Sequence, residues 1–409
     1  MFFKDPTYNF QALRTLSATP IQCADINECL QTIQLIEEGK DESWFTQWNL
    51  LAQRLEKEAE NFKNENHHIS ASSAYKRASN YYRTAEFFLH IHPNDSRMLQ
   101  TWRKSRDCFL LAIENQSPTV MPIQIPFEGT FLPGYLCLVD NSHLMRPLII
   151  AQTGFDGTAE EICSLIGAAA VSRGYNCLVF EGPGQGQVIR EQKIPFRWNW
   201  ETVITPVVDY ALDLPYVSKD HMTLLGLSFG GYLVPRALAF EKRINYGIVN
   251  GGIYDYHAVC MKALPLESET ALDHLYSAQE LDQIILEEAK HNSSIRWGIN
   301  QGMYTFNAKT PTEWFKMTRK YQLKEVIANI SCHMLVVDSE QDFQMRDQSK
   351  QFFDHLQCQK DWLIFTKQEG AGAHCQIGAY SLSNERIFNW LDKQMLNAGV
   401  HIYKKTNSK

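Results

Sequence analysis

The 409-residue sequence lacks long hydrophobic runs. No stretch approaches the roughly 20 apolar residues that a helix needs to cross a bilayer. Residues 1–5 lead directly into polar sequence, without the apolar segment of a secretory signal. We therefore expect a cytoplasmic protein that has no membrane among its partners.

The sequence also has no excess of positive charge. It contains 39 Lys and Arg against 46 Asp and Glu, which gives a net charge of −7. No basic patch or arginine-rich run is present, and such charge is what draws a protein to nucleic acid. We therefore expect a small-molecule substrate and no nucleic-acid partner.

Patterns for disulfides, metals and phosphates are missing as well. The ten cysteines are scattered from Cys23 to Cys375 without a C-x-x-C pair, which favours reduced thiols. No H-E-x-x-H or comparable cluster indicates a metal. The glycine-rich run at 181–186 is not followed by Lys-Ser/Thr, so it does not fit a phosphate-binding loop. The sequence predicts neither a metal nor another cofactor.

What the sequence does contain is a serine enclosed by glycines. Residues 226–231 read G-L-S-F-G-G; an apolar stretch at 222–225 predicts a strand before them, and periodic apolar residues predict a helix after them. This arrangement is typical of a nucleophile elbow, whose sharp turn leaves no room for neighbouring side chains. Ser228 is the candidate nucleophile, and the N–H of Phe229 is a candidate oxyanion donor. The alternative is a structural glycine turn. Pro235 is expected to kink the following helix or to shift its first turns.

The amino-terminal quarter shows helical periodicity. Four helices are predicted, at 24–38, 42–64, 70–90 and 95–115. We assign residues 1–118 to an all-helical domain, most simply a cap over an active site. A dimerisation module is the alternative, and a homodimer is compatible with both.

Aromatic residues are dense at 81–88 within this helical domain. Arg83 and Glu86, three residues apart, can pair on one helix face. Tyr81 and Arg83 are candidates for lining a pocket for an aromatic substrate. Packing in the core of the domain is the favoured alternative.

From residue 119 to about 400 the pattern changes to strands and then to alternating strands and helices. A hairpin is predicted from 121–127 and 132–139 around a turn at 128–130. Further strands are predicted at 147–152, 176–180, 222–225, 245–249, 332–337 and 362–366, and helices at 158–173, 201–214 and 377–396. The order predicts an α/β fold with a mostly parallel sheet and helices on both faces. A helix-rich insertion at about 255–328 interrupts it, and 401–409 form a polar tail.

In such a sheet, functional groups gather where the strands end. After the strand at 147–152, the N–H of Phe155 is the natural second oxyanion donor, although a plain turn is the alternative. Glu181 follows the next strand and is more simply structural than a substrate contact. Tyr254 and Asp255 follow the strand at 245–249 and are candidates for binding the leaving group.

Two aspartates compete for the role of the acid in a Ser-Asp-His order. Asp338 closes the strand at 332–337, and Asp342 lies further out in the loop, from which a side chain reaches back to an imidazole. We favour Asp342. His374 follows the last strand on a loop of small residues and is the candidate base, with a surface histidine as the alternative.

Together these motifs resemble the α/β-hydrolases that carry an amino-terminal helical cap. The resemblance rests on residues 78–83, 153–156, 181–186, 228 and 372–375, and it extends from about residue 8 to 397. The family includes the fungal yellowish-green polyketide-shortening hydrolases, the bacterial dihydroxypseudooxynicotine hydrolase and the FrsA-like esterases.

The resemblance implies a triad of Ser228, Asp342 and His374, with Phe155 and Phe229 as oxyanion donors. In the first two groups it implies hydrolysis of a carbon–carbon bond next to a carbonyl in an aromatic or polyketide substrate. The nicotine-pathway enzyme uses a further pocket carboxylate, for which Asp255 is the candidate position in this sequence. Alternatives are a carboxylesterase, a peptidase, and a non-catalytic binding protein on the same scaffold.

Overall fold

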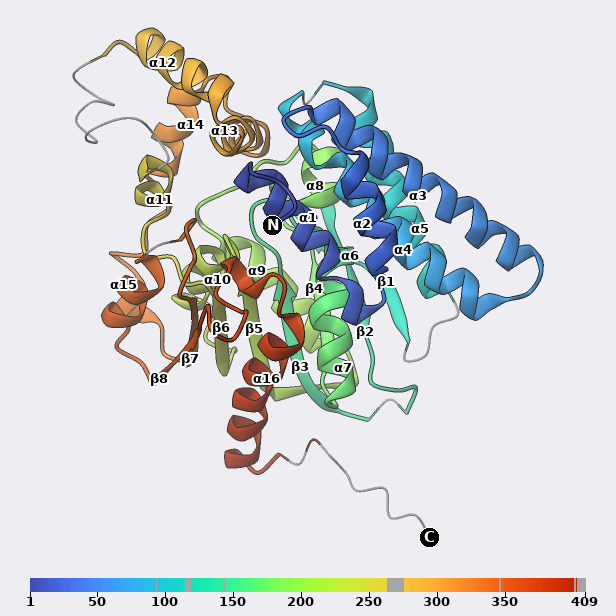
Figure 1. The fold of residues 1–409 in the computed structure, drawn as a ribbon. Coiled ribbons are helices and arrows are strands. Elements are labelled where there is room, and N and C mark those ends of the chain that lie inside the picture. The colour runs from blue at the N-terminus through green and yellow to red at the C-terminus, as the bar shows by residue number, and fades with distance from the viewer. Residues whose placement is uncertain are drawn as a thin grey trace. The chain divides into compact units, whose positions relative to one another are not determined.

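The computed structural model describes residues 1–92, 94–114, 119–142, 144–262, 276–345, 347–400 and 402. The chain divides into two compact units. Figure 1 colours the ribbon by residue number, from blue at the N-terminus to red at the C-terminus. The first comprises Met1–Asn115, Ile189–Arg197 and Asp255–Gln322; the second comprises Gln116–Val188, Trp198–Tyr254 and Leu323–Lys409. Residues 263–275 of the predicted insertion, and all of the predicted tail except residue 402, lie outside the described residues.

The first unit is helical. Its amino-terminal helices are α1 (Pro6–Leu16), α2 (Ile26–Leu35), α3 (Asp41–Asn64), α4 (His68–Glu86) and α5 (Ser96–Ile113). The later segment adds α11 (Tyr256–Lys262), α12 (Ala278–His291), α13 (Ser293–Phe306) and α14 (Pro311–Thr318). The predicted helical character of the amino-terminal region is confirmed. Helix α1 was not predicted from the sequence. Asp5 caps it by accepting the N–H groups of Thr7 and Tyr8.

Aromatic side chains form much of the core of this unit. Trp44 and Trp48 lie one turn apart on α3 and are fully buried. Tyr8 of α1 meets Trp44 edge to face, with ring centroids 5.4 Å apart. The later segment belongs to the same core, because Trp297 of α13 stacks on Phe87 at 4.4 Å. Helices that are about 200 residues apart in sequence therefore share one apolar interior.

The second unit is built on an eight-stranded sheet. Its strands are β1 (Val120–Phe127), β2 (Thr130–Cys137), β3 (Arg146–Gln152), β4 (Asn176–Phe180), β5 (Val217–Leu227), β6 (Tyr246–Asn250), β7 (His333–Ser339) and β8 (Lys360–Phe365). They lie in the order β1-β2-β4-β3-β5-β6-β7-β8. β1 and β2 form the predicted hairpin, β2 runs antiparallel to β4, and all other pairs are parallel. The predicted fold class is confirmed.

Helices flank this sheet. They are α6 (Ala159–Ile162), α7 (Ala168–Ser172), α9 (Glu201–Leu212), α10 (Gly230–Leu238), α15 (Gln348–His355) and α16 (Tyr380–Asn397), while the short α8 (Gly186–Arg190) leads from one unit into the other. Residues Cys163–Gly167 form a π-helical turn between α6 and α7. The last helix begins at Tyr380, three residues later than predicted, because Gly378, inside the predicted range, has a φ of +95° that an α-helix does not allow.

Pro235 lies inside α10, which continues past it to Leu238. A proline lacks the N–H that would bond the carbonyl four residues earlier, here that of Gly231. The N–H of Ile253 donates to this carbonyl instead, at 3.0 Å. The proline thus leaves an acceptor that ties α10 to the segment following β6.

The parallel register brings the carboxyl ends of the central strands to one edge. Gln152 at the end of β3 lies opposite Gly226, and Leu227 at the end of β5 lies opposite Asn250. Ser339 at the end of β7 lies opposite Phe365. The segments that leave these strands are therefore neighbours.

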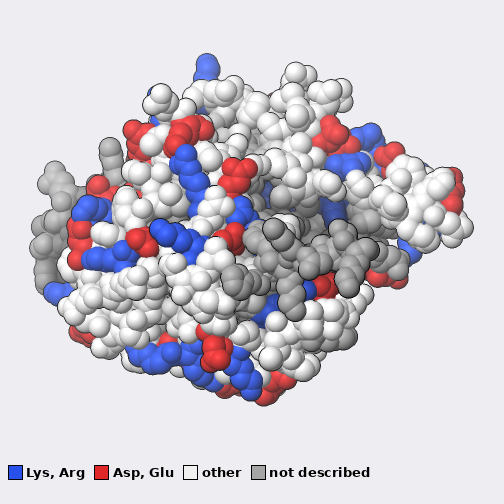
Figure 2. Space-filling view, turned by 90° about the horizontal axis from the view of Figure 1, so that it is seen from below, with Lys and Arg blue, Asp and Glu red and all other residues white. Residues whose placement is uncertain are grey.

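Charges of both signs are mixed on the surface. On the face drawn in Figure 2, blue and red side chains are interspersed among white ones. Oppositely charged neighbours on the helices form local pairs, such as Lys350 with Asp354 and Lys290 with Glu287. Exposed pairs of this kind contribute little to stability.

Candidate active site

Ser228 occupies the turn between β5 and α10. Its φ is +57°, in the left-handed region that is strained for residues with a side chain. A Cβ at Gly226 would lie 2.4 Å from the carbonyl oxygen of Gly230, and one at Gly231 would lie 1.8 Å from that of Gly251. These close approaches explain why glycines surround the serine.

Three side chains that are distant in sequence meet at the carboxyl edge of the sheet. Nε2 of His374 lies 2.9 Å from Oγ of Ser228, and Nδ1 of His374 lies 2.6 Å from Oδ2 of Asp342. His374 and Asp342 are 4% and 7% exposed. The imidazole therefore connects a hydroxyl to a buried carboxylate.

The charges of the buried pair stabilise each other. Burial by itself would raise the pKa of Asp342, but the charge of His374 and the N–H groups of Met345 and Gln344 lower it below its usual value. Burial would lower the pKa of His374, but the carboxylate of Asp342 raises it well above its usual value. The site therefore favours an imidazolium beside a carboxylate, which is the pair that forms when the imidazole accepts a proton.

Asp338, the competing acid, has different surroundings. It lies within β7, opposite Ile364 of β8. Burial raises its pKa, which is the opposite of the shift at Asp342. His374 forms its ion pair with Asp342, at 2.6 Å. Of the two aspartates, the structure brings Asp342 to the imidazole.

Comparison with known proteins identifies the family. No family model matches the sequence. Hydrolase LUC6 of a Fusarium species is 31% identical, over 96% of this chain and 97% of its own. The 20-hydroxy-prefusarin hydrolase FUS2 of Gibberella moniliformis is 30% identical, over 95% and 97%. The α/β hydrolase psoB of Aspergillus fumigatus is 29% identical, over 96% and 94%. The chain belongs to the α/β-hydrolase family.

A solved structure agrees with this assignment at the level of the fold. The crystal structure of 2,6-dihydroxy-pseudo-oxynicotine hydrolase aligns with a TM-score of 0.73 and 19% identity, over 94% of this chain and 96% of that one. The structure of AbyA5 aligns with a TM-score of 0.62 and 15% identity, over 91% and 89%. The resemblance predicted from the sequence motifs is confirmed.

In this α/β-hydrolase the loop after β3 lies against the serine turn. A Cβ at Gly154 would lie 2.5 Å from the backbone nitrogen of Phe229 and 3.0 Å from Cβ of Ser228. The rings of Phe155 and Phe229 meet edge to face, with centroids 6.2 Å apart. The two residues predicted as oxyanion donors are thus neighbours beside Ser228, and the glycine at 154 permits the approach.

A buried glutamine supports this loop from the glycine-rich run at 181–186. Nε2 of Gln185 donates to the carbonyls of Thr153 and Gly154, at 3.0 and 2.9 Å, and its Oε1 accepts the N–H of Gly182 at 3.0 Å. Gln185 is not among the site residues predicted from the sequence. The only signal was a polar side chain within a run of glycines.

Glu181, a candidate substrate contact, is 2% exposed in the hydrolase. Its carboxylate accepts the N–H groups of Ala159 and Gln187, at 2.9 and 2.6 Å. Ala159 is the first residue of α6 and Gln187 is the second residue of α8. The carboxylate therefore accepts backbone N–H groups at the starts of two helices. These contacts correspond to the structural alternative, and contact with substrate stays a prediction.

Tyr254 and Asp255, the candidates for binding the leaving group, fall in different units. The ring of Tyr254 stacks on His355 at 4.4 Å. Oδ1 of Asp255 accepts the N–H of Ala258 at 3.0 Å, at the start of α11. Their roles toward substrate, and that of Asp255 as the extra carboxylate, stay predictions.

Tyr81 and Arg83 lie in the first unit. Tyr81 is fully buried, its hydroxyl donates to Glu28 at 2.9 Å, and burial raises its pKa. Arg83 is 7% exposed and donates to Oγ1 of Thr84 at 3.0 Å. Tyr81 belongs to the hydrophobic core of the unit, as the packing alternative proposed. Substrate contacts for these residues also stay predictions.

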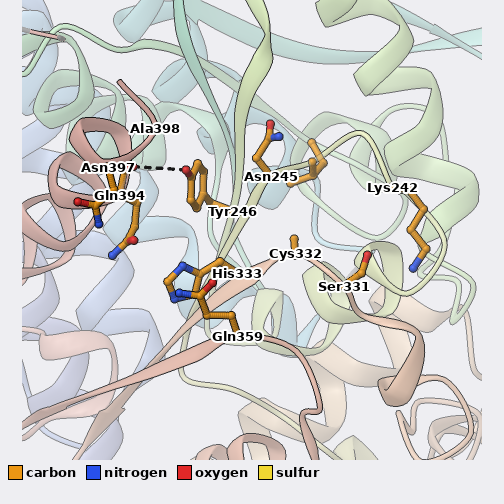
Figure 3. A pocket seen from close by; sticks show the side chains of 11 residues that line it. Lys242, Asn245, Tyr246, Ser331, Cys332, His333, Gln359, Gln394, Asn397 and Ala398 are labelled. Carbon is orange, nitrogen blue, oxygen red and sulfur yellow. Dashed lines mark hydrogen bonds between the residues drawn. The ribbon is translucent and has the colours of Figure 1, made fainter. Parts of the chain in front are cut away.

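A polar hollow opens at the opposite end of the hydrolase sheet (Figure 3). Tyr246 and His333 line it at the starts of β6 and β7, and Gln394 lines it near the end of α16. The Tyr246 hydroxyl is directed toward the carbonyl of Gln394, at 3.5 Å. Because Ser228 follows the carboxyl end of its strand, this hollow is separate from the site around the serine.

Neither a metal cluster nor a membrane-spanning helix occurs among the described residues. In that part of the chain, no group of three or more His, Cys, Asp or Glu side chains is arranged to hold a metal ion. None of the helices in the described ranges has the length and apolar character needed to span a bilayer.

Proposed function

We propose that the chain is a serine hydrolase in which Ser228 is the nucleophile, His374 the general base and Asp342 the acid that orients the imidazole. The observation that carries this proposal is the continuous contact from hydroxyl to imidazole to carboxylate, with distances of 2.9 and 2.6 Å. The raised pKa of His374 supports it, because Asp342 stabilises the imidazolium that proton transfer creates.

In this mechanism His374 removes the Ser228 proton as the serine oxygen attacks a substrate carbonyl. The backbone N–H groups of Phe155 and Phe229 stabilise the oxyanion of the tetrahedral intermediate. The bond from the carbonyl carbon to the leaving group then breaks, and the proton on His374 passes to that group. Water, activated by the same imidazole, hydrolyses the acyl–serine ester.

The bond cleaved is proposed to be a carbon–carbon bond next to a carbonyl in a polyketide-like or aromatic small molecule. A carbanion leaves only when it is stabilised, for example as the enolate of a β-diketone. The relative FUS2, named a 20-hydroxy-prefusarin hydrolase, and the resemblance to polyketide-shortening hydrolases support this substrate class. Cleavage of a small ester uses the same groups and is the alternative.

Product analysis with two substrates tests the proposal. One is an aryl β-diketone or acylated polyhydroxynaphthalene, and the other is a short-chain nitrophenyl ester. Ser228→Ala should lower turnover by about 10⁴-fold or more, because no other hydroxyl replaces the nucleophile. Ser172→Ala is the matched control, since Ser172 is an exposed serine on α7 that bonds its own helix.

Carbon–carbon hydrolysis would be supported if the native protein and Ser172→Ala cleave the diketone and Ser228→Ala does not. Cleavage of the ester alone would move the assignment to an esterase. Turnover of both substrates at the unmodified rate in Ser228→Ala would refute the serine mechanism. Labelling of the native protein by a fluorophosphonate, absent in Ser228→Ala, separates a reactive serine from a non-catalytic scaffold.

A further inference from the structure

Gln376, two residues after His374, places a fully buried amide behind the site. Its Nε2 donates to Oδ1 of Asn250 at 3.0 Å and to Oγ of Ser339 at 2.8 Å. Its Oε1 accepts from Nδ2 of Asn250 and from Oγ of Ser383, both at 2.7 Å. A glutamine amide has two donor hydrogens and two acceptor positions, so all of its hydrogen-bonding capacity is used.

The partners of this amide lead to the other members of the proposed triad. Asn250 ends β6, and its carbonyl accepts the N–H of Ser228 at 2.7 Å. Ser339 ends β7, and its carbonyl accepts the N–H of Asp342 at 3.0 Å. One side chain thus connects the segments that carry the serine, the carboxylate and the histidine.

The backbone around Gln376 is strained. Cys375 and Gln376 have φ of +51° and +52°, and two successive left-handed residues without glycine are unfavourable. Such a turn persists only where its surroundings over-determine it. The four hydrogen bonds of the Gln376 amide provide this constraint, and Sγ of Cys375 adds a contact of 3.3 Å to the carbonyl of Asn250.

We propose that Gln376 is a positioning residue that holds His374 at hydrogen-bonding distance from both Ser228 and Asp342. The proposal rests on the proposed function of the triad. Gln376 acts through the turn that bears His374, and the amide ties that turn to the ends of β6 and β7. Loosening it lets the imidazole move, and a displacement of about 1 Å in a reacting group costs on the order of 100-fold in rate.

The test compares Gln376→Met with Gln394→Met. The first change keeps the length of the side chain and removes all four hydrogen bonds. The second replaces another buried glutamine of the same unit, near the far end of α16, and serves as the control. For Gln376→Met we expect kcat on the nitrophenyl ester to fall by about 10- to 100-fold with KM changed less than about threefold. We expect Gln394→Met to keep the native kcat.

The pH profile separates positioning from a general loss of structure. If the contact between His374 and Asp342 is looser in Gln376→Met, the pKa of His374 is lower than in the native protein. The rise of kcat/KM with pH should then begin at lower pH in this variant. Partial unfolding lowers the amount of active protein without moving that rise. Circular dichroism at the assay temperature establishes that the variant is folded.

Ser339→Ala keeps the test decisive if Gln376→Met does not fold. It removes one hydroxyl and only the link toward Asp342, so we expect a smaller fall in kcat and a pH shift in the same direction. The positioning role alone would be overturned if folded Gln376→Met has native kcat and an unshifted pH profile. If Gln376→Met does not fold, the same result in Ser339→Ala would overturn it. Native turnover in Ser228→Ala would instead overturn the serine mechanism, and the positioning role with it.

Discussion

Each of the two units buries a carboxylate against an imidazole. In the second unit, Asp342 lies 2.6 Å from Nδ1 of His374, and the other ring nitrogen lies 2.9 Å from the Ser228 hydroxyl. In the first unit, Glu86 lies 2.9 Å from Nε2 of His90, and the other ring nitrogen faces Oε1 of Gln301. All four members of the two pairs are less than a tenth exposed.

The two pairs differ in their third partners. Arg190 donates to both carboxylate oxygens of Glu86, at 2.7 and 3.0 Å. Burial alone would raise the pKa of Glu86, but the charges of Arg190 and His90 lower it to about 2. A carboxamide oxygen at the far nitrogen has no proton to transfer, whereas a hydroxyl has one. A buried carboxylate–imidazole pair therefore indicates general-base chemistry only when the ring nitrogen that faces away from the carboxylate contacts a group with a proton to give.

Removing the carboxylate of the second-unit pair should have the largest effect on activity. Asp342→Asn leaves the imidazole without the charge that orients and stabilises it, and we expect kcat to fall by about 10⁴-fold. Asp338→Asn is the matched control and should stay within about fivefold, because Asp338 lies in the strand. Steady-state kinetics on the nitrophenyl ester measures both, and the opposite order of effects would assign the acid to Asp338.

The pH dependence of activity reports on the charge of the second-unit pair. The pKa of His374 lies well above its usual value, and in the proposed mechanism only the neutral imidazole accepts the serine proton. We therefore expect kcat/KM to rise with pH through that raised pKa, above the ordinary range of histidine. In Asp342→Asn the residual activity should rise at lower pH, because the stabilising charge is gone. A rise that moves to higher pH in that variant would contradict the electrostatic account.

The first-unit pair should affect stability more than the pH profile of catalysis. Glu86→Gln leaves Arg190 buried without its carboxylate, which costs about 3–5 kcal/mol of unfolding free energy. Denaturant unfolding measures this loss, and the pH at which kcat/KM rises should stay native. The double variant Glu86→Gln/Arg190→Met should lose less than the sum of the single variants, since removing both charges leaves none unpaired. Additive losses would show that the pair does not act as a unit.

Acid should weaken the same pair in the native protein. The pKa of Glu86 is lowered from 4.5 in an ordinary glutamate to about 2. The pair therefore contributes its full stability above about pH 4.5 and loses it as the pH falls toward 2. The stability difference between native protein and Glu86→Gln should shrink over that range.

Local patterns in the sequence were sufficient to predict the fold and the residues that meet in the candidate site. The glycines around Ser228 and the alternation of strands and helices predicted the sheet, its order of elements and the serine turn. The position of His374 after the last strand followed from the same order. The sequence favours Asp342 over Asp338 as the acid but does not decide between them. The contact of Asp342 with His374 depends on the path of a loop whose N–H groups bond Asp342.

What sequence reasoning missed consists of contacts between side chains far apart in the chain. Gln376 and Asn250 are 126 residues apart, and no local pattern relates their two amides. The pairing of Glu86 with Arg190 joins residues 104 apart, whereas the sequence pattern suggested only Arg83, three residues away, as a possible partner of Glu86. α1 was missed despite a local signal, since Asp5 and Pro6 are a common start of a helix. Long-range polar contacts require the three-dimensional path of the chain.

The first unit is assembled from segments that the ribosome produces at very different times. Its five amino-terminal helices emerge early, but Trp297, which stacks on Phe87, and Gln301, which bonds His90, emerge about 200 residues later. Until then Phe87 and His90 lack these two partners. Contacts of such high sequence separation slow folding, because a long loop must close before they form. Completion of the helical unit must therefore wait until most of the strands of the sheet have been synthesised.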